Sequence, residues 1–336
     1  MARSRRVNSS RTEIIRDQDS FESIESDWWR LWSQSASATP FQSPAWLLPW
    51  WRAFTPGDLA VIAVWSGNDL IGLAPLYVER DAGGSRLLPV GISLSDYLDI
   101  LCAPGAETHV GTAIAEAVLS LDWSQWILPD LPAGSTASAM AIAGTREEQH
   151  AGHAACPILA LAGDETLAGS VPSRRRRQLR RAHNAALRRG RVEIAPAQTD
   201  PELFLYELTR LHGARWAGHG GGVLADSAAV GFHRDALPRL YANGLARCWT
   251  IKIDNAVVGA YYGFHHRSRA YAYLGGFDPS YAEESPGAIL IGNAITEAIR
   301  EGGGEFDFLR GREEYKYSWG ALDRWTMQKI WTRQTP

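Results

Sequence analysis

The pattern of apolar and polar positions predicts the same order of strands and helices in the two halves of the chain. In the first half, the helical period predicts helices over 20–33 and 45–54, and Trp28, Leu31 and Trp32 share one face of the first. The remaining elements follow from alternation and turn residues: strands 59–65 and 70–78 around a turn at 66–69, strand 97–102, a helix from Pro104-Gly105 to about 121, and strand 126–128.

The second half repeats this order. Alternation predicts strands over 246–253, 256–265 and 269–277. Pro286-Gly287 leads into a predicted helix that ends at the glycines 302–304, and a strand over 305–309 follows. Each half is therefore predicted to be an α+β unit, in which helices flank a mixed, mostly antiparallel sheet.

Three short echoes between the halves predict a duplication. Residues 111–118 reappear as 292–299, 103–106 as 285–288, and 68–72 as 255–259, in the same order and at nearly constant offset. The chain length of 336 residues suits two domains of ordinary size. We predict a disordered tail over 1–12, an N-terminal domain over 13–165 and a C-terminal domain over 166–336.

Composition narrows the class of protein. The formal net charge of −3 argues against a protein wholly committed to nucleic acid. The three cysteines and nine histidines form no metal or disulfide pattern, so we expect no metal site. No signal peptide and no membrane-spanning apolar run are visible, and we expect a cytoplasmic protein.

An arginine-rich segment separates the halves. Nine arginines fall within residues 174–191, and Pro172-Ser173 before them is a helix-start signal. Such a run binds phosphates, acidic sugars or nucleic acid, or it is a solvated helix face. The sequence leaves both readings open.

Polar and glycine-rich motifs in the second half could carry chemistry. Ser285-Pro286-Gly287 is either a phosphate cradle at a helix start or an ordinary helix start. Gly275-Gly276 indicates a β-bulge, a close backbone approach or a simple strand end. Asp307, between two phenylalanines, is either paired structurally or has a raised pKa suited to proton transfer. The glycine-rich loop over 218–222 is either a lid or a connector.

Residues 170–319 resemble the GNAT-related acetyltransferase-like family of CelD type, which is linked to cellulose and exopolysaccharide biosynthesis. The matching pieces are the arginine run at 174–181, Leu211-His212 with Arg215-Trp216, Gly276-Phe277-Asp278-Pro279, Ser285-Pro286-Gly287, Asp307-Phe308-Leu309 with Gly311, and Tyr315-Lys316. Residues 41–46 and 95–97 also resemble this family, so the match covers most of the chain. More distantly, the chain is similar to the FemABX aminoacyl transferases, which also place two GNAT-like halves in one chain.

The resemblance implies two tandem GNAT-like domains, of which the C-terminal one is catalytic. It implies transfer of an acyl group from an acyl-CoA, acetyl-CoA or longer, to an amine or hydroxyl of a saccharide or small acceptor. Asp307 would act as the base or orient one, and Tyr315 or Tyr273 would give a proton to the thiolate. Ser285, Gly287 and Ala288 would hold the pyrophosphate. The acceptor would be held by Arg177, His212, Arg215, Trp216, Tyr262, Asp278 and Lys316.

Two other functions stay open. One is an aminoacyl-tRNA-dependent transferase, which the arginine run favours through phosphate contacts. The other is a non-catalytic GNAT-like binding protein of a polysaccharide pathway. Glu283-Glu284 favours the second alternative, because these carboxylates stand where the family has its usual pyrophosphate-binding loop.

Overall fold

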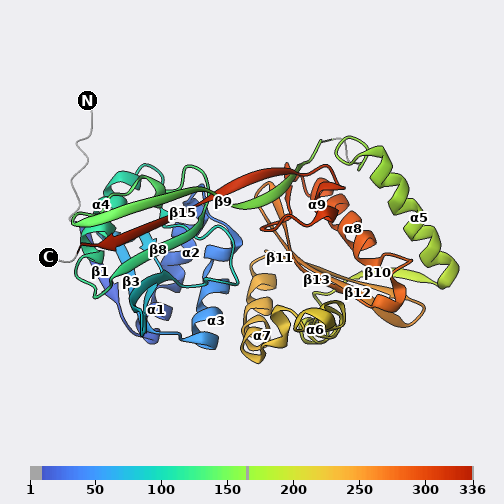
Figure 1. The fold of residues 1–336 in the computed structure, drawn as a ribbon, viewed down its shortest axis with the longest axis horizontal. Coiled ribbons are helices and arrows are strands. Elements are labelled where there is room, and N and C mark those ends of the chain that lie inside the picture. Colours follow the sequence, from blue (N-terminus) through green and yellow to red (C-terminus); the bar gives the residue numbers. More distant parts are fainter. Residues whose placement is uncertain (1–9, 164–165, 335–336) are drawn as a thin grey trace. The chain divides into compact units, whose positions relative to one another are not determined.

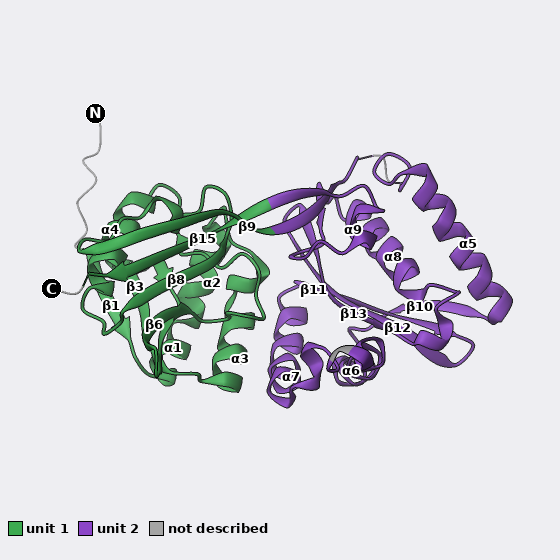
Figure 2. Ribbon diagram, viewed as in Figure 1, with its two compact units in different colours: residues 1–154, 325–336 green, residues 155–324 purple. Residues whose placement is uncertain are grey.

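The chain forms two compact units in a computed structural model that describes residues 10–163 and 166–334. Unit 1 contains the described residues up to Ala154 and from Trp325 onward, and unit 2 is Ala155–Arg324 (Figure 2). The division therefore differs from the predicted boundary at 165, because the last strand returns to unit 1. Of the predicted tail, residues 1–9 lie outside the described residues, whereas 10–12 belong to a strand.

Unit 1 contains two groups of strands and four α-helices. The first group is antiparallel in the order β1-β3-β4-β7. The second has the order β15-β8-β6-β5-β2, in which β6 and β8 run parallel and the described pairs β15–β8, β6–β5 and β5–β2 run antiparallel. The elements are β1 Ser10–Ile15, α1 Gln18–Ser23, α2 Glu25–Gln34, α3 Pro44–Phe54, β2 Asp58–Leu59, β3 Val61–Ser66, β4 Asp69–Ala74, β5 Leu76–Asp81, β6 Gly84–Pro89, β7 Leu101–Cys102, α4 Glu107–Val118, β8 Gln125–Leu131 and β15 Leu322–Arg333.

Unit 2 is built on strands in the order β10-β11-β12-β13-β14-β9, in which only the β13–β14 pair is parallel. Helices α6 and α7 cover one face of β11–β13, and α8 and α5 cover the other (Figure 1). The elements are β9 Thr145–Ala160, α5 Ser173–Arg189, β10 Val192–Pro196, α6 Pro201–Trp216, α7 Ser227–Ala242, β11 Ala246–Ile253, β12 Ala256–His266, β13 Arg269–Phe277, α8 Pro286–Arg300, β14 Glu305–Asp307 and α9 Glu314–Tyr317. No helix in the described ranges is both long and apolar enough to cross a bilayer.

The sequence echoes fall on equivalent elements of the two units. Each unit has a hairpin, β3–β4 or β11–β12, and a later helix, α4 or α8, that packs on it. A Cβ added at Gly72 would lie 2.4 Å from a methyl of Val110 on α4, and one at Gly259 would lie 3.2 Å from a methyl of Leu290 on α8. The echoed glycine thus lets the helix approach its hairpin closely in both units, which confirms two α+β units of the same design.

Several local predictions were wrong, and most errors lie at breaks in elements. The single helix predicted over 20–33 is two helices, because Ile24 leaves the helical conformation between α1 and α2. The single strand predicted over 70–78 is β4 and β5, which pair with different neighbours. Pro75 stands between them and has no N–H to give to a ladder. The strand predicted over 97–102 shortens to β7, since Tyr97 adopts a positive φ of 59°.

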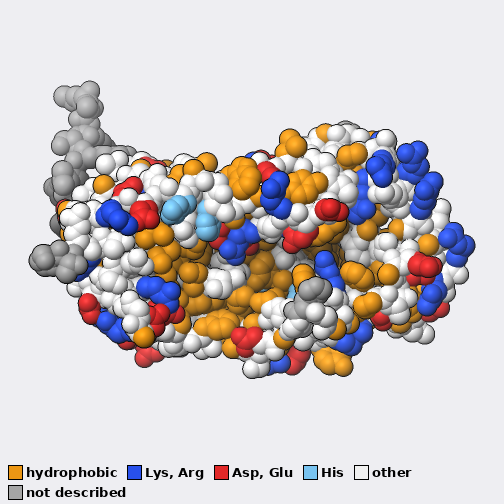
Figure 3. Space-filling model, viewed as in Figure 1, with side chains coloured by type: hydrophobic (Ala, Val, Ile, Leu, Met, Phe, Trp, Pro, Cys, Tyr) orange, Lys and Arg blue, Asp and Glu red, His pale blue; other side chains and the backbone are white. Residues whose placement is uncertain are grey.

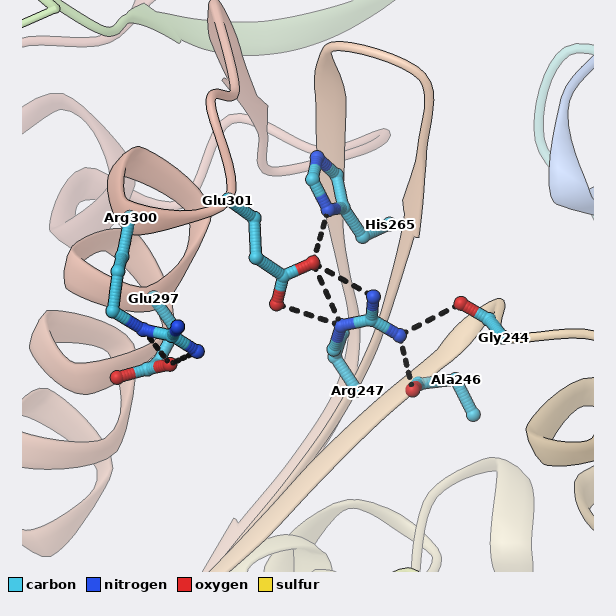
Figure 4. Close-up of polar contacts among 7 residues, drawn as sticks. All are labelled: Gly244, Ala246, Arg247, His265, Glu297, Arg300 and Glu301. Carbon is cyan, nitrogen blue, oxygen red and sulfur yellow. Dashed lines mark hydrogen bonds and ion pairs between the residues drawn. The ribbon is translucent and has the colours of Figure 1, made fainter.

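An ion-pair network fixes the C-terminal end of α8 to the sheet (Figure 4). Glu301, which caps the helix, accepts two hydrogen bonds from Arg247 of β11 and lies 2.5 Å from Nδ1 of the buried His265 on β12. The Arg247 hydrogen bonds hold the pKa of Glu301 at about 2. This end of α8 is therefore anchored to β11 and β12 by charge.

Candidate active site

His212 is the polar side chain that the fold positions most tightly on the α6 face of unit 2. A Cβ added at Gly276 of β13 would lie 2.4 Å from the His212 amide nitrogen and 2.5 Å from the Leu211 carbonyl carbon. Only glycine permits this approach of strand to helix. The close approach expected of the Gly275-Gly276 pair is therefore present at Gly276, and it brings the His212 ring onto the strand.

The imidazole of His212 is fixed in one tautomer. Its Nδ1 lies 3.2 Å from the carbonyl oxygen of Gly275, so Nδ1 carries the proton and donates it. The side chain is only 5% exposed, and burial lowers its pKa below the ordinary value of 6.5. At neutral pH the ring is consequently uncharged, and Nε2 has a lone pair that can accept a proton.

Further predicted residues gather around His212. The Arg215 guanidinium lies 5.5 Å from the Trp216 ring and 5.6 Å from the Phe277 ring, and the His212 and Trp216 rings are 6.2 Å apart. Arg215 is also close enough to the Tyr315 hydroxyl to affect its ionisation, although burial is the larger effect and raises the pKa of Tyr315 to about 12. Three residues predicted from sequence thus lie together on α6, and the Tyr315 hydroxyl of α9 is within electrostatic range of Arg215.

The glycine-rich loop over 218–222 passes close to the His212 imidazole. Gly220, Gly221 and Gly222 all have positive φ, between 73° and 80°, and two short 3₁₀ turns flank them. A Cβ added at Gly222 would lie 2.4 Å from His212 Nε2, whereas one at Gly220 would meet nothing within 4 Å. The backbone at Gly222 therefore lies close beside the basic nitrogen of His212.

This contact gives a matched pair of variants. We expect Gly222→Ala to displace the His212 ring and lower kcat at least tenfold, because the added methyl occupies the position of Nε2. Gly220→Ala also places a methyl at a positive φ in this loop, but its ψ of 15° lies in the αL region, which costs less strain than the ψ of −173° at Gly222. It makes no clash, so its kcat should stay near wild type. Steady-state kinetics of both variants would check this, and equal losses would show that only backbone strain matters.

The start of α8 offers few free donors to a phosphate. Pro286 has no N–H, the Ser285 N–H donates to Ala282, and the Ala288 and Ile289 N–H groups both donate to the Ser285 carbonyl. Among the described N–H groups of this turn, that of Gly287 has no backbone acceptor. Phe277 would be 3.5 Å from a Cβ at Gly287, so this donor lies beside the end of β13.

The two acidic residues before α8 do not both face this turn. Glu284 is buried, and its carboxylate lies 3.5 Å from Arg189 at the end of α5, which also stacks 4.8 Å over Tyr281. Glu283 is exposed. The Glu284 carboxylate, one of the two at the position of the family's pyrophosphate-binding loop, is thus paired with Arg189.

Asp307 and Lys316 brace the turn that leads to Tyr315. Asp307 is fully buried, and its Oδ1 accepts a 2.8 Å hydrogen bond from the N–H of Leu309, a residue with φ of +58°. The Lys316 ammonium donates to the carbonyls of Leu309, Arg310 and Gly311, and it pairs with Glu313. Lys316, expected to contact the acceptor, therefore has its three protons engaged within the turn.

The other predicted acceptor contacts lie elsewhere. Tyr262 is fully buried, in ring contact with Tyr273 and with His233 of α7. Asp278 accepts hydrogen bonds from Ser280 and so shapes the turn before α8. Arg177 is exposed on α5, on the opposite side of the sheet from α6. The structure does not bring these three side chains to His212.

Two features escaped the sequence analysis. The bulge in β13 is at Tyr273, since Tyr262 pairs with Leu274 and Gly263 with Ala272, and not at the glycine pair. His233 is completely buried beside Tyr262 and Tyr273, and burial, helped by His212, lowers its pKa to about 3. No pattern in the sequence distinguishes His233 from an ordinary helical residue. Among the described residues, no group of three or more His, Cys, Asp and Glu is arranged to hold a metal.

Comparison with known proteins identifies the fold. Residues 173–317 match the family model described as Acetyltransferase (GNAT) domain. The structure of FemX superposes with a TM-score of 0.65 at 11% identity, covering 91% of this chain and 95% of that one.

Two further structures cover nearly the whole chain. A tandem GNAT protein from the clavulanic acid biosynthesis pathway has a TM-score of 0.53 at 15% identity, covering 97% of this chain and all of that one. L-PGS from Bacillus licheniformis has a TM-score of 0.55 at 12% identity, covering 92% and 91%. No curated protein matched by sequence. Unit 2 therefore matches the GNAT domain model over residues 173–317, and the chain as a whole has the fold of two tandem GNAT-like domains.

Proposed function

We propose that unit 2 transfers an acyl group from an acyl-CoA to an amine or hydroxyl of a saccharide or small acceptor, with His212 as the general base. The observation that carries this proposal is the fixed, neutral imidazole of His212, oriented by the Gly275 carbonyl and bordered by Arg215 and Trp216. The proposal replaces Asp307 by His212 as the base, since the Asp307 carboxylate is buried and bonded to the Leu309 N–H.

The proposed reaction is a direct displacement at the acyl carbon. Nε2 of His212 removes the proton from the acceptor while its nitrogen or oxygen bonds to the acyl carbon, and the carbon–sulfur bond breaks. The leaving thiolate takes a proton from Tyr315, a phenol that is protonated at neutral pH at its ordinary pKa as well as at its raised one. The tyrosinate then regains a proton from the His212 imidazolium through solvent, which restores both groups. Arg215 and Trp216 hold the acceptor, and Asp307 orients the turn that carries Tyr315.

The proposed donor site is the start of α8. Its Gly287 N–H and the positive end of the helix dipole would face the pyrophosphate, with Ser285 beside them. The Ala288 N–H, in contrast, is already engaged with Ser285. The scarcity of free donors is the specific observation that favours the second candidate, in which the donor is an aminoacyl-tRNA.

Calorimetry with acetyl-CoA and longer acyl-CoAs tests the donor. We expect binding, and we expect Gly287→Ala to weaken it at least tenfold by placing a methyl beside the free N–H. Gly105→Ala, in the turn before α4 of unit 1, changes a glycine with φ of +79° outside unit 2, and this control should bind acyl-CoA as wild type does. Absence of acyl-CoA binding, together with acyl transfer from aminoacyl-tRNA, would establish the second candidate. Absence of both activities would leave a binding protein.

A further inference from the structure

Helix α5 carries eight arginines and no acidic residue over Ser173–Arg189. Three of the arginines attach the helix to unit 2. Arg175 stacks 4.2 Å over Trp319, Arg176 donates to the Val171 carbonyl at 3.1 Å, and Arg189 approaches Glu284. The other five are exposed, and no described carboxylate lies within ion-pair distance of them: Arg174, Arg177, Arg180, Arg181 and Arg188.

These five arginines, the outward arc of α5, form a single stripe. At 100° per residue they fall within an arc of about 120°, opposite the buried Ala182 and Ala186 that pack α5 onto the unit. From Arg174 to Arg188 the stripe is about 21 Å long, at a rise of about 1.5 Å per residue. Blue side chains gather over this helix in the space-filling view (Figure 3). Of the four consecutive arginines 174–177, only Arg174 and Arg177 belong to the stripe, and Arg180, Arg181 and Arg188 continue it along the helix.

The helix dipole makes this arrangement unfavourable without a partner. Four arginines occupy positions 174–177, where the helix end is itself positive, and the first turn has neither an acidic residue nor a side-chain cap. Bound anions would relieve this repulsion. The charge distribution of α5 thus indicates a phosphate-bearing partner.

The shape of the surface distinguishes between polyanions. The major groove of duplex RNA is deep and narrow, so a helix can enter it only if most sides of the helix are exposed. The inner side of α5 is covered by the rest of unit 2. The outward arc has no aromatic side chain on which a single-stranded base could stack. It is bordered instead by Leu187, which is apolar and 52% exposed, and which suits the hydrocarbon edge of a bilayer.

We propose that the outward arc of α5 docks unit 2 onto a membrane of anionic phospholipids. The arginines bind headgroup phosphates along one line, and Leu187 enters the interface beside them. The net charge of −3 on the chain disfavours contact through the remaining surface, so the arc determines which side of unit 2 faces the lipid. This inference does not depend on the nature of the acyl donor.

Vesicle sedimentation of the full chain tests the proposal. We expect binding to phosphatidylcholine vesicles that contain about 30% phosphatidylglycerol, no binding to phosphatidylcholine alone, and loss of binding at high salt. Replacing Arg174, Arg177, Arg181 and Arg188 by Gln should lower the partition coefficient by roughly 10²- to 10³-fold, at about one decade or less per arginine. Glutamine keeps a similar helix propensity, so the fold should be retained.

A charge-matched variant distinguishes an effect of the outward arc of α5 from an effect of the total charge of the protein. Arg30, Arg80, Arg146 and Arg300 are exposed arginines outside α5, and replacing them by Gln removes the same charge. This variant should bind vesicles as wild type does. Equal losses in the two variants would overturn the proposal, as would absence of vesicle binding. Displacement from vesicles by duplex RNA at equal phosphate concentration would also overturn it, in favour of an RNA partner.

Discussion

Replacing His212 by Asn is expected to lower kcat by about 10²- to 10⁴-fold, the usual contribution of a general base, while the protein stays folded. The Asn amide can still donate to the Gly275 carbonyl, so the contact between α6 and β13 survives. The Asn side chain has no counterpart of the Nε2 lone pair, so it cannot accept the proton. Steady-state kinetics with the donor found by calorimetry, and the melting temperature of the same sample, would measure the two effects separately.

The pH dependence of wild-type activity follows from the same side chain. The pKa of His212 is lowered by burial, so the neutral base is present above pH 6.5 and is lost only as the pH falls through its depressed pKa. Activity should therefore stay level from pH 6.5 to 8 and decline at lower pH. His109→Asn, at an exposed histidine of α4, is the control and should change neither kcat nor the profile. Full activity of the His212 variant would exclude this residue as the base.

Replacing Asp307 by Ala is expected to destabilise unit 2 by about 2–3 kcal/mol, because the buried N–H of Leu309 loses its acceptor. Asp307→Asn retains an acceptor oxygen and should lose less. Thermal unfolding, with hydrogen exchange at the Leu309 amide, would measure both. Asp122→Ala, on an exposed side chain paired with Arg80, should change stability by less than about 1 kcal/mol.

The activity of the Asp307 variants distinguishes its two possible roles. If Asp307 only orients the turn before Tyr315, activity should follow stability, and Asp307→Asn should keep most of it. If Asp307 is itself the base, Asp307→Asn should be inactive although folded. The second result would falsify the assignment of the base to His212.

Local patterns predicted the repeated hairpins and helices because each of these elements contacts residues near it in sequence. Alternation located β11 to β13 almost to their ends, and the echoed glycines marked the approach of helix to hairpin in each unit. The strand β9 was missed, since most of its first ten residues are exposed and show no alternation. The strands that pair with β9 are distant from it in sequence, and the local pattern of apolar and polar residues does not predict such pairs.

The residues of the candidate site could likewise be proposed from the sequence, whereas their contacts with distant segments could not. The sequence proposed His212, Arg215, Trp216 and Tyr315 through resemblance, and the spacing of the first three places them on one face of α6. The contact of that face with β13 depends on Gly276, which touches the backbone of a helix more than sixty residues earlier. The orientation of the His212 ring depends on a carbonyl 63 residues away. Such contacts between segments distant in sequence are properties of the folded chain.

The strands β9 and β15 pass through both units, and this has a consequence for synthesis. Unit 1 receives its last strand from residues 325 onward, where Ile330 pairs with Ile127 and the fully buried Trp331 stacks 4.6 Å from Trp126. All of unit 2 is translated between these two tryptophans. Unit 1 therefore keeps one side of Trp126 uncovered until the residues from 325 onward have been made and can pair with β8.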